Sequence, residues 1–84
     1  MIFIVLVKFR KKLTKDDVAP SPQVFQRAGA KMISGYWTLG RYDAVITVEA
    51  PDEKAVMKAV MQFGDLVATE TLIAVPRDEA IKLL

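Results

Sequence analysis

The chain begins with an unbroken run of β-branched, aliphatic and aromatic residues, IFIVLV, at positions 2–7. Runs of this kind are typical of strands that are covered on both faces. Alternate side chains would point to opposite sides, with Ile2, Ile4 and Leu6 on one and Phe3, Val5 and Val7 on the other. We therefore expect a central strand with apolar contacts above and below it.

Two later segments place their apolar residues at helical spacing and have clear start signals. Ser21 followed by Pro22 predicts a helix over residues 22–28, because a hydroxyl caps the first turn and proline suits the first helical position. Asp52 is the expected N-cap of a second helix, which runs to Gly64.

Residues 10–21 are mostly polar and connect the first strand to the first of these helices. Thr14 and Asp17 resemble the capping pair at the start of a helix. Pro20 follows closely and is expected to stop any helix there.

Three further strands are predicted from apolar runs bounded by turn residues, over residues 31–39, 42–50 and 66–75. Gly40 and Arg41 join the first two of these strands as a two-residue hairpin, with glycine at the first turn position. Pro76 cannot continue the last strand, and residues 77–84 form a short helical tail.

The resulting order, β-α-β-β-α-β, is that of the ferredoxin-like α+β fold, here as a single domain over residues 1–84. A four-stranded antiparallel sheet would carry both helices on one face and leave the other open. Hydrophobic residues make up 52% of the chain and mean hydropathy is +0.25, so the open face would be a large apolar patch. Since such patches usually mark interfaces, we expect a homodimer, or a higher homo-oligomer, in which open sheet faces pack together.

The composition excludes several function classes. A net charge of +2 is too mild to indicate a nucleic-acid partner. The chain has no Cys and no His, and no spacing of its carboxylates resembles a metal site, so we expect no metal and no cofactor. The longest apolar run is far shorter than a membrane-spanning helix needs, and it has no secretory-signal pattern. We expect a cytoplasmic protein without a membrane partner.

The predicted hairpin decides which side chains share a face of the sheet. A two-residue loop pairs Trp37 with Ala44, and cross-strand partners point to the same side. Trp37 and Tyr42 would then join the helix-side core, which suits large aromatic residues. The opposite face carries both polar and apolar side chains. We expect its polar side chains to line a small-molecule site at the sheet and dimer face. These are Tyr36, Thr38, Asp43 and Thr47, with Arg41 at the rim.

Asp43 is the residue with the most specific chemical hypothesis. As a catalytic group it would act as a general base, with Tyr36 donating to a developing oxyanion, provided that its carboxylate pKa is raised. Alternatively, Asp43 caps the hairpin by binding Arg41 or backbone amides, as aspartates in turns usually do. Arg41 would face solvent, pair with a charged group across the dimer, or bind an anionic ligand. The residues alone leave these alternatives open.

Three segments resemble the GYD domain family, namely YWTLGRYD at 36–43, VEAPD at 48–52 and TETL at 69–72. The Gly-x-Tyr-Asp-like signature of that family is met by Gly40, Tyr42 and Asp43. The resemblance covers residues 1–75 and implies a ferredoxin-like, dimeric α+β barrel protein without an established activity or an agreed catalytic set. The first helix is shorter here than is usual in the family, which leaves the cover of the sheet's helix side in question.

A more distant likeness is to the ligand-binding domain of leucine-responsive regulators, which shares the element order and a similar hairpin. Three functions follow as alternatives. The first is a small homo-oligomeric protein that binds a small molecule. The second is a cofactor-free oxygenase or isomerase, as found among dimeric α+β barrel proteins, with Asp43 as the base. The third is a stand-alone effector-binding domain. Whether the protein is an enzyme stays open at this point.

Overall fold

The computed structural model describes residues 1–84 and contains one four-stranded antiparallel sheet. The strands, in spatial order β2-β3-β1-β4, are β1 (Ile2–Phe9), β2 (Lys31–Trp37), β3 (Ala44–Glu49) and β4 (Val67–Ala74). The helices are α1 (Lys15–Val18), α2 (Ser21–Arg27), α3 (Glu53–Met61) and α4 (Arg77–Ile81). This arrangement confirms the ferredoxin-like α+β fold, with β1 as a central strand.

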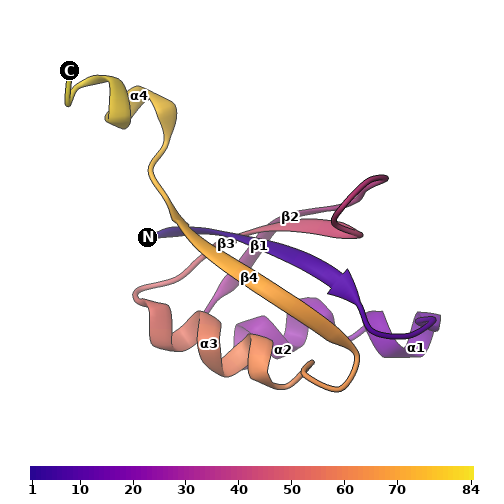
Figure 1. Ribbon diagram of the computed structural model, residues 1–84. Coiled ribbons are helices and arrows are strands. Elements are labelled where there is room, and N and C mark those ends of the chain that lie inside the picture. Colours follow the sequence, from indigo (N-terminus) through magenta and orange to yellow (C-terminus); the bar gives the residue numbers. More distant parts are fainter.

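The core is a thin apolar layer between one face of the sheet and the helices α2 and α3, which lie side by side (Figure 1). Alternate residues of β1 point into this layer, and no buried residue is polar or charged. The largest side chains that are fully buried come from β1, β3 and α3, namely Phe3, Val5, Val48 and Val56. This helix face of the sheet therefore supplies most of the burial that stabilises the fold.

Local signals explain where α1 and α3 begin. The predicted hydroxyl cap of α2 is wrong, because this helix already includes Ser21, whose hydroxyl donates to the Val18 carbonyl. The Ala55 amide donates a 3.1 Å hydrogen bond to the Asp52 carboxylate at the start of α3, as expected for an N-cap. The prediction omitted α1, which exists because Thr14 and Asp17 form a complete capping box. This helix is only one turn long because Pro20 stops it, as expected.

The loop between β2 and β3 is longer than predicted. The amide of Thr38 bonds the Asp43 carbonyl at 2.9 Å, so residues 39–42 lie between the last paired residues, in place of a two-residue turn. The Thr38 hydroxyl also donates to the Tyr42 carbonyl at 2.7 Å. Gly40 supplies the positive φ of +118° that this wider loop requires. The pairing of Trp37 with Ala44 is unaffected and confirms the predicted register.

Trp37 and Tyr42 are not core residues, which corrects the sequence-based expectation. Trp37 is on the helix face, as predicted, but it is 67% exposed because β2 is an edge strand whose end extends past the helix layer. The wider loop turns Tyr42 the other way, and its hydroxyl reaches Glu70 of β4. Glu70 pairs with Leu6 on the open face, so Tyr42 covers part of that face.

The open face of the sheet carries the apolar side chains expected from the sequence. Ile4 and Leu6 are half-buried there, and Leu72 of β4 is 42% exposed. The homodimer that this face predicts stays a prediction, since the structure describes one chain.

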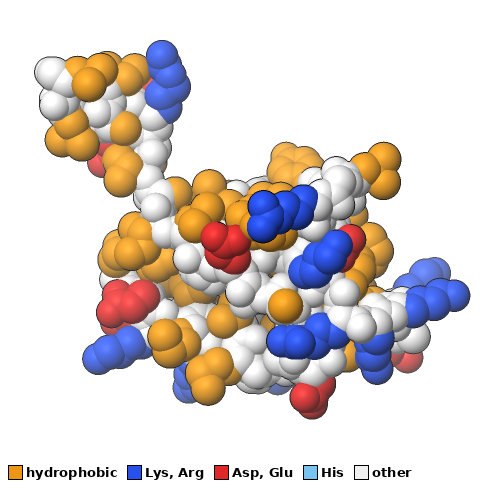
Figure 2. Space-filling model, in the orientation of Figure 1, with side chains coloured by type: hydrophobic (Ala, Val, Ile, Leu, Met, Phe, Trp, Pro, Cys, Tyr) orange, Lys and Arg blue, Asp and Glu red, His pale blue; other side chains and the backbone are white.

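The last helix, α4, stands apart from the sheet and its helices. It follows β4 through Val75 and Pro76 and projects beyond the body of the molecule (Figure 1). Figure 2 shows hydrophobic side chains gathered on this projecting segment. Among all the helices, none has the length and apolar character needed to cross a lipid bilayer.

The core assignment predicts that Phe3→Ala lowers the free energy of unfolding by about 3–5 kcal/mol, because a nearly inaccessible aromatic ring is replaced by a cavity. Urea denaturation measures this loss. Met61→Ala is the control, since Met61 is 71% exposed and its truncation should cost at most about 0.5 kcal/mol. Equal effects of the two substitutions would contradict the assignment.

Candidate functional site

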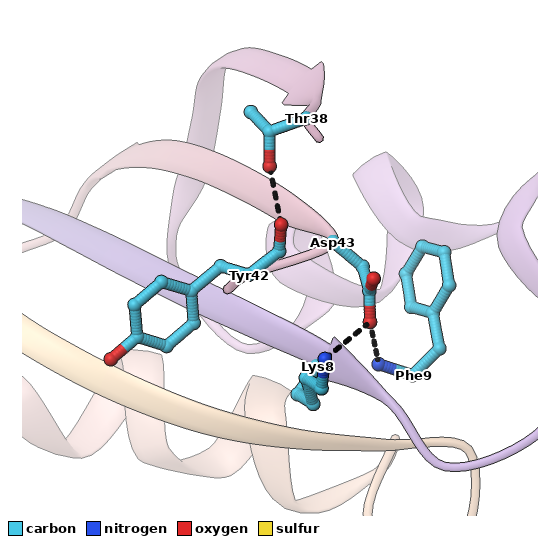
Figure 3. Close-up of polar contacts among 5 residues, drawn as sticks. All are labelled: Lys8, Phe9, Thr38, Tyr42 and Asp43. Atoms are coloured by element: carbon cyan, nitrogen blue, oxygen red, sulfur yellow. Dashed lines mark hydrogen bonds and ion pairs between the residues drawn. The ribbon is translucent and has the colours of Figure 1, made fainter. Parts of the chain in front are cut away.

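Asp43 connects the hairpin loop to the end of β1 (Figure 3). The Phe9 amide donates to Asp43 Oδ2 at 2.7 Å, and the ammonium of Lys8 lies 4.0 Å from the same oxygen. The Asp43 amide donates in turn to the Val7 carbonyl at 2.8 Å. These contacts match the alternative in which Asp43 binds backbone amides. Strand β3 is shorter than β1 and leaves the Phe9 amide without a backbone partner, so the Asp43 carboxylate accepts its hydrogen bond instead.

Tyr42 makes a second link across the sheet. Its hydroxyl donates to a Glu70 carboxylate oxygen at 2.7 Å, and the guanidinium of Arg41 lies 5.7 Å from the centre of its ring. The hydrogen bond to Glu70 raises the pKa of Tyr42 above its ordinary value, because ionisation would remove the donated proton and place two negative charges together.

The predicted polar site is only partly assembled on the open side of the sheet. Thr38 lies beside Asp43, but its hydroxyl is bound to the Tyr42 carbonyl. Tyr36, which is 66% exposed, makes no side-chain hydrogen bond, and Thr47 is half-buried one strand away. Arg41 is exposed at the loop, as expected for a rim residue. Their role in ligand binding stays a prediction.

A mainly apolar cavity lies on the other side of the sheet. It has a volume of about 380 Å³ and sits between the helix face, α1, α2 and the end of α3. Of its 21 lining residues, 16 are hydrophobic, so its walls are mainly apolar. Among the residues predicted for the site, only Tyr36 lines this cavity, and Asp43 does not.

Aromatic side chains form two walls of the cavity. Phe9 and Trp37 meet edge to face, with ring centres 4.9 Å apart, at the β2 side. Phe25 of α2 and Phe63 after α3 stack at 6.3 Å on the helix side. Rings in these arrangements offer both faces and edges to a ligand, which suits an aromatic or compact aliphatic molecule.

The polar groups at the cavity are already engaged within the protein. The Asp17 carboxylate accepts the Thr14 amide at 2.9 Å, and hydrogen bonding to Thr14 holds the pKa of Asp17 below its ordinary value. The Ser21 hydroxyl donates to the Val18 carbonyl at 2.7 Å. Since no buried side-chain polar atom lacks a partner, the cavity presents mostly apolar surface to a ligand.

Sequence reasoning missed this cavity, although two signals pointed to it. The first was the short first helix, which leaves part of the helix face without cover. The second was the pair of small residues, Gly35 and Ala44, on that face. A β-carbon added at Gly35 would meet no atom within 4 Å, so the space beside it is open.

The structure contains no group of three or more Asp, Glu, His or Cys residues that could hold a metal ion.

The comparison with protein families returns the GYD domain, matched over residues 5–84. The chain belongs to the GYD domain family. No curated protein matches the sequence. The signature residues of this GYD domain each have a structural task in the loop: Gly40 adopts the positive φ, Tyr42 binds Glu70 and Asp43 binds the Phe9 amide.

We expect Asp43→Ala to lower the free energy of unfolding by about 1.5–3 kcal/mol, because the Phe9 amide loses its charged acceptor. Asp43→Asn should cost less, since the amide oxygen of asparagine still accepts. Urea denaturation gives the free energies, and hydrogen exchange of the Phe9 amide should accelerate in Asp43→Ala. An unchanged exchange rate would show that the bond is not formed in solution.

The Tyr42–Glu70 bond predicts a pH-dependent contribution to stability. A pKa raised by folding means that the bond stabilises the protein below the ordinary tyrosine pKa, and that this contribution is lost as pH rises through the raised value. In a Tyr36→Phe background, where Tyr42 is the only tyrosine, Glu70→Ala should lower the titration midpoint measured by phenolate absorbance. An unchanged or higher midpoint would contradict the bond.

Proposed function

We propose that this GYD domain binds a compact, uncharged, apolar small molecule in the cavity between the helix face of its sheet and the helices α1 and α2. The observation that carries the proposal is an apolar cavity of about 380 Å³ in a chain of 84 residues. Small-molecule pockets occupy roughly 300–1,000 Å³, so this volume suits a ligand at the small end of that range.

The lining supports an uncharged ligand. Apolar cavities hold water poorly and accept apolar molecules of matching size. Asp17 is the only charged residue that lines the cavity, and its negative charge would disfavour an anion. The aromatic walls, Phe9 with Trp37 and Phe25 with Phe63, favour a planar or ring-containing molecule.

The proposal includes self-association through the open sheet face. Ile4, Leu6 and Leu72 form an apolar surface there, on the side of the sheet that no helix covers. Packing two such faces together would remove this surface from water, while each cavity stays accessible on the opposite side. We also propose that the protein is cytoplasmic, as expected from its sequence.

Gly35→Leu tests the cavity directly. The added side chain points into open space on the helix face and should fill part of the cavity without a steric clash. With N-phenyl-1-naphthylamine as an uncharged aromatic probe, the substitution should weaken binding about tenfold or more, which corresponds to about 1.4 kcal/mol. Probe fluorescence and the emission of Trp37, which lines the cavity, both report binding.

Ser34→Leu is the matched control, because it adds the same side chain one residue earlier, on the open face. It should leave the affinity for the probe within about twofold of the unsubstituted protein. Binding that is lost in Ser34→Leu and retained in Gly35→Leu would overturn the proposed location. Failure of the probe to bind the unsubstituted protein would overturn the proposed ligand class.

A further inference from the structure

A run of positive charge and an exposed apolar loop lie side by side at one end of the sheet. The basic run, residues 8–15, reads KFRKKLTK and holds five of the twelve Lys and Arg residues of the chain, without any Asp or Glu. The loop between β2 and β3 lies at the same end of the sheet (Figure 1). The Phe9 amide bonds Asp43 at 2.7 Å and the Phe9 ring meets that of Trp37 at 4.9 Å, so the two segments are in direct contact.

The loop presents large apolar side chains to solvent. Leu39 is 103% exposed, and Trp37, at the end of β2, is 67% exposed. The bond between the Thr38 amide and the Asp43 carbonyl leaves Leu39 outside the strand pairing. A fully exposed leucine beside an exposed tryptophan is unfavourable in water and is typical of a surface that contacts an apolar partner.

The positive charges beside the loop are mostly unpaired. The only ion pair of the chain joins Lys8 and Asp43 at 4.0 Å. Arg41 adds an exposed positive charge on the loop itself. The remaining basic side chains of the run are exposed and take part in no ion pair, namely Arg10, Lys11, Lys12 and Lys15.

Nearby carboxylates offset only part of this charge. Asp16 and Asp17 follow the basic run, and the Asp17 carboxylate accepts the Thr14 amide at 2.9 Å. Five positive charges less these two leave residues 8–17 at +3, whereas the whole chain is at +2, so all other residues together carry −1. Figure 2 shows Lys and Arg side chains gathered toward this end of the body, beside hydrophobic ones and away from the projecting α4.

We propose that this end of the molecule docks on the surface of an anionic lipid bilayer, with Leu39 and Trp37 in the interfacial layer and the basic run over the headgroups. Tryptophan is favoured at membrane interfaces, and each Lys or Arg near an anionic leaflet adds attraction. The cytoplasmic leaflet carries anionic lipids, so this docking agrees with the proposed location. The sequence-based expectation of no membrane partner rested on the lack of a spanning segment, which docking on the surface does not need.

The combination of aliphatic surface and positive charge favours a lipid partner over a nucleic acid. Single-stranded nucleic acids stack their bases on aromatic rings, and Leu39 has no ring. A bilayer interface accepts both Leu39 and the indole of Trp37, while its anionic headgroups attract the cations. Phe9, Leu13 and Trp37 also line the apolar cavity, so the docked end includes part of the proposed ligand site. The docking itself requires no ligand in the cavity.

Co-sedimentation with vesicles of phosphatidylserine and phosphatidylcholine in equal parts tests the docking. The unsubstituted protein should bind these vesicles, and it should bind far less to vesicles of phosphatidylcholine alone. Lys11→Gln combined with Lys12→Gln should weaken binding about tenfold or more, because two charges near the headgroups are lost. Leu39→Ala should weaken binding at least about threefold, because less apolar surface enters the interface.

Matched controls change the same residue types elsewhere on the surface. Lys54→Gln combined with Lys58→Gln removes two exposed charges from α3, and Leu84→Ala truncates a leucine that is 106% exposed in the C-terminal segment. Both controls should leave vesicle binding within about twofold of the unsubstituted protein. Brominated phosphatidylcholine in the mixed vesicles should quench the emission of Trp37, the single tryptophan of the chain.

Three results would each overturn the proposed docking. They are absence of binding to the mixed vesicles, whether or not a single-stranded RNA oligonucleotide binds, equal losses in the substituted and control proteins, and Trp37 emission that brominated lipid leaves unquenched. Gly35→Leu, which fills part of the cavity, should bind vesicles as the unsubstituted protein does. Loss of vesicle binding and loss of probe binding are therefore separate outcomes, and failure of the docking leaves the proposed function intact.

Discussion

The structure depends on one constraint: a single layer of side chains must cover a four-stranded sheet, and the chain has few residues with which to do it. Phe3, Val48 and Val56 form the centre of that layer and are almost inaccessible to solvent. The helices that complete it are short, since α2 has seven residues and α3 has nine. Because these helices are short, they leave a cavity on their side of the sheet. The other face of the sheet has no helix at all.

The hairpin loop that carries the family signature makes its contacts with other strands of the sheet and not with the proposed ligand site. Asp43 binds the Phe9 amide at the end of β1, and Tyr42 reaches across β1 to Glu70 of β4. These two links bind the loop to two other strands. The pattern Gly-x-Tyr-Asp therefore has a sufficient physical explanation in the geometry of the loop, and the proposed ligand site lies elsewhere, among apolar residues.

Much of the fold could be predicted because its determinants are local. The run at residues 2–7 and the Asp52 cap act within a few residues, and each was followed by the expected element. The helix expected after Ser21 is also present, although the Ser21 hydroxyl does not cap it. The loop at residues 38–43 could not be predicted in the same way, because its width depends on Thr38 and Asp43 bonding across the loop and to β1. The cavity depends on where α2 ends above the sheet, which is a tertiary property that no single segment encodes.

In the proposed complex, the ligand occupies the helix side of the sheet and not its open face. The most direct measurement is a methyl-detected NMR titration of the unsubstituted protein with N-phenyl-1-naphthylamine. Val5, Ile46 and Val60 line the cavity, so their methyl signals should shift, while those of Ile4, Val45 and Leu72, on the open face, should not. Shifts confined to the open-face methyls would contradict the account.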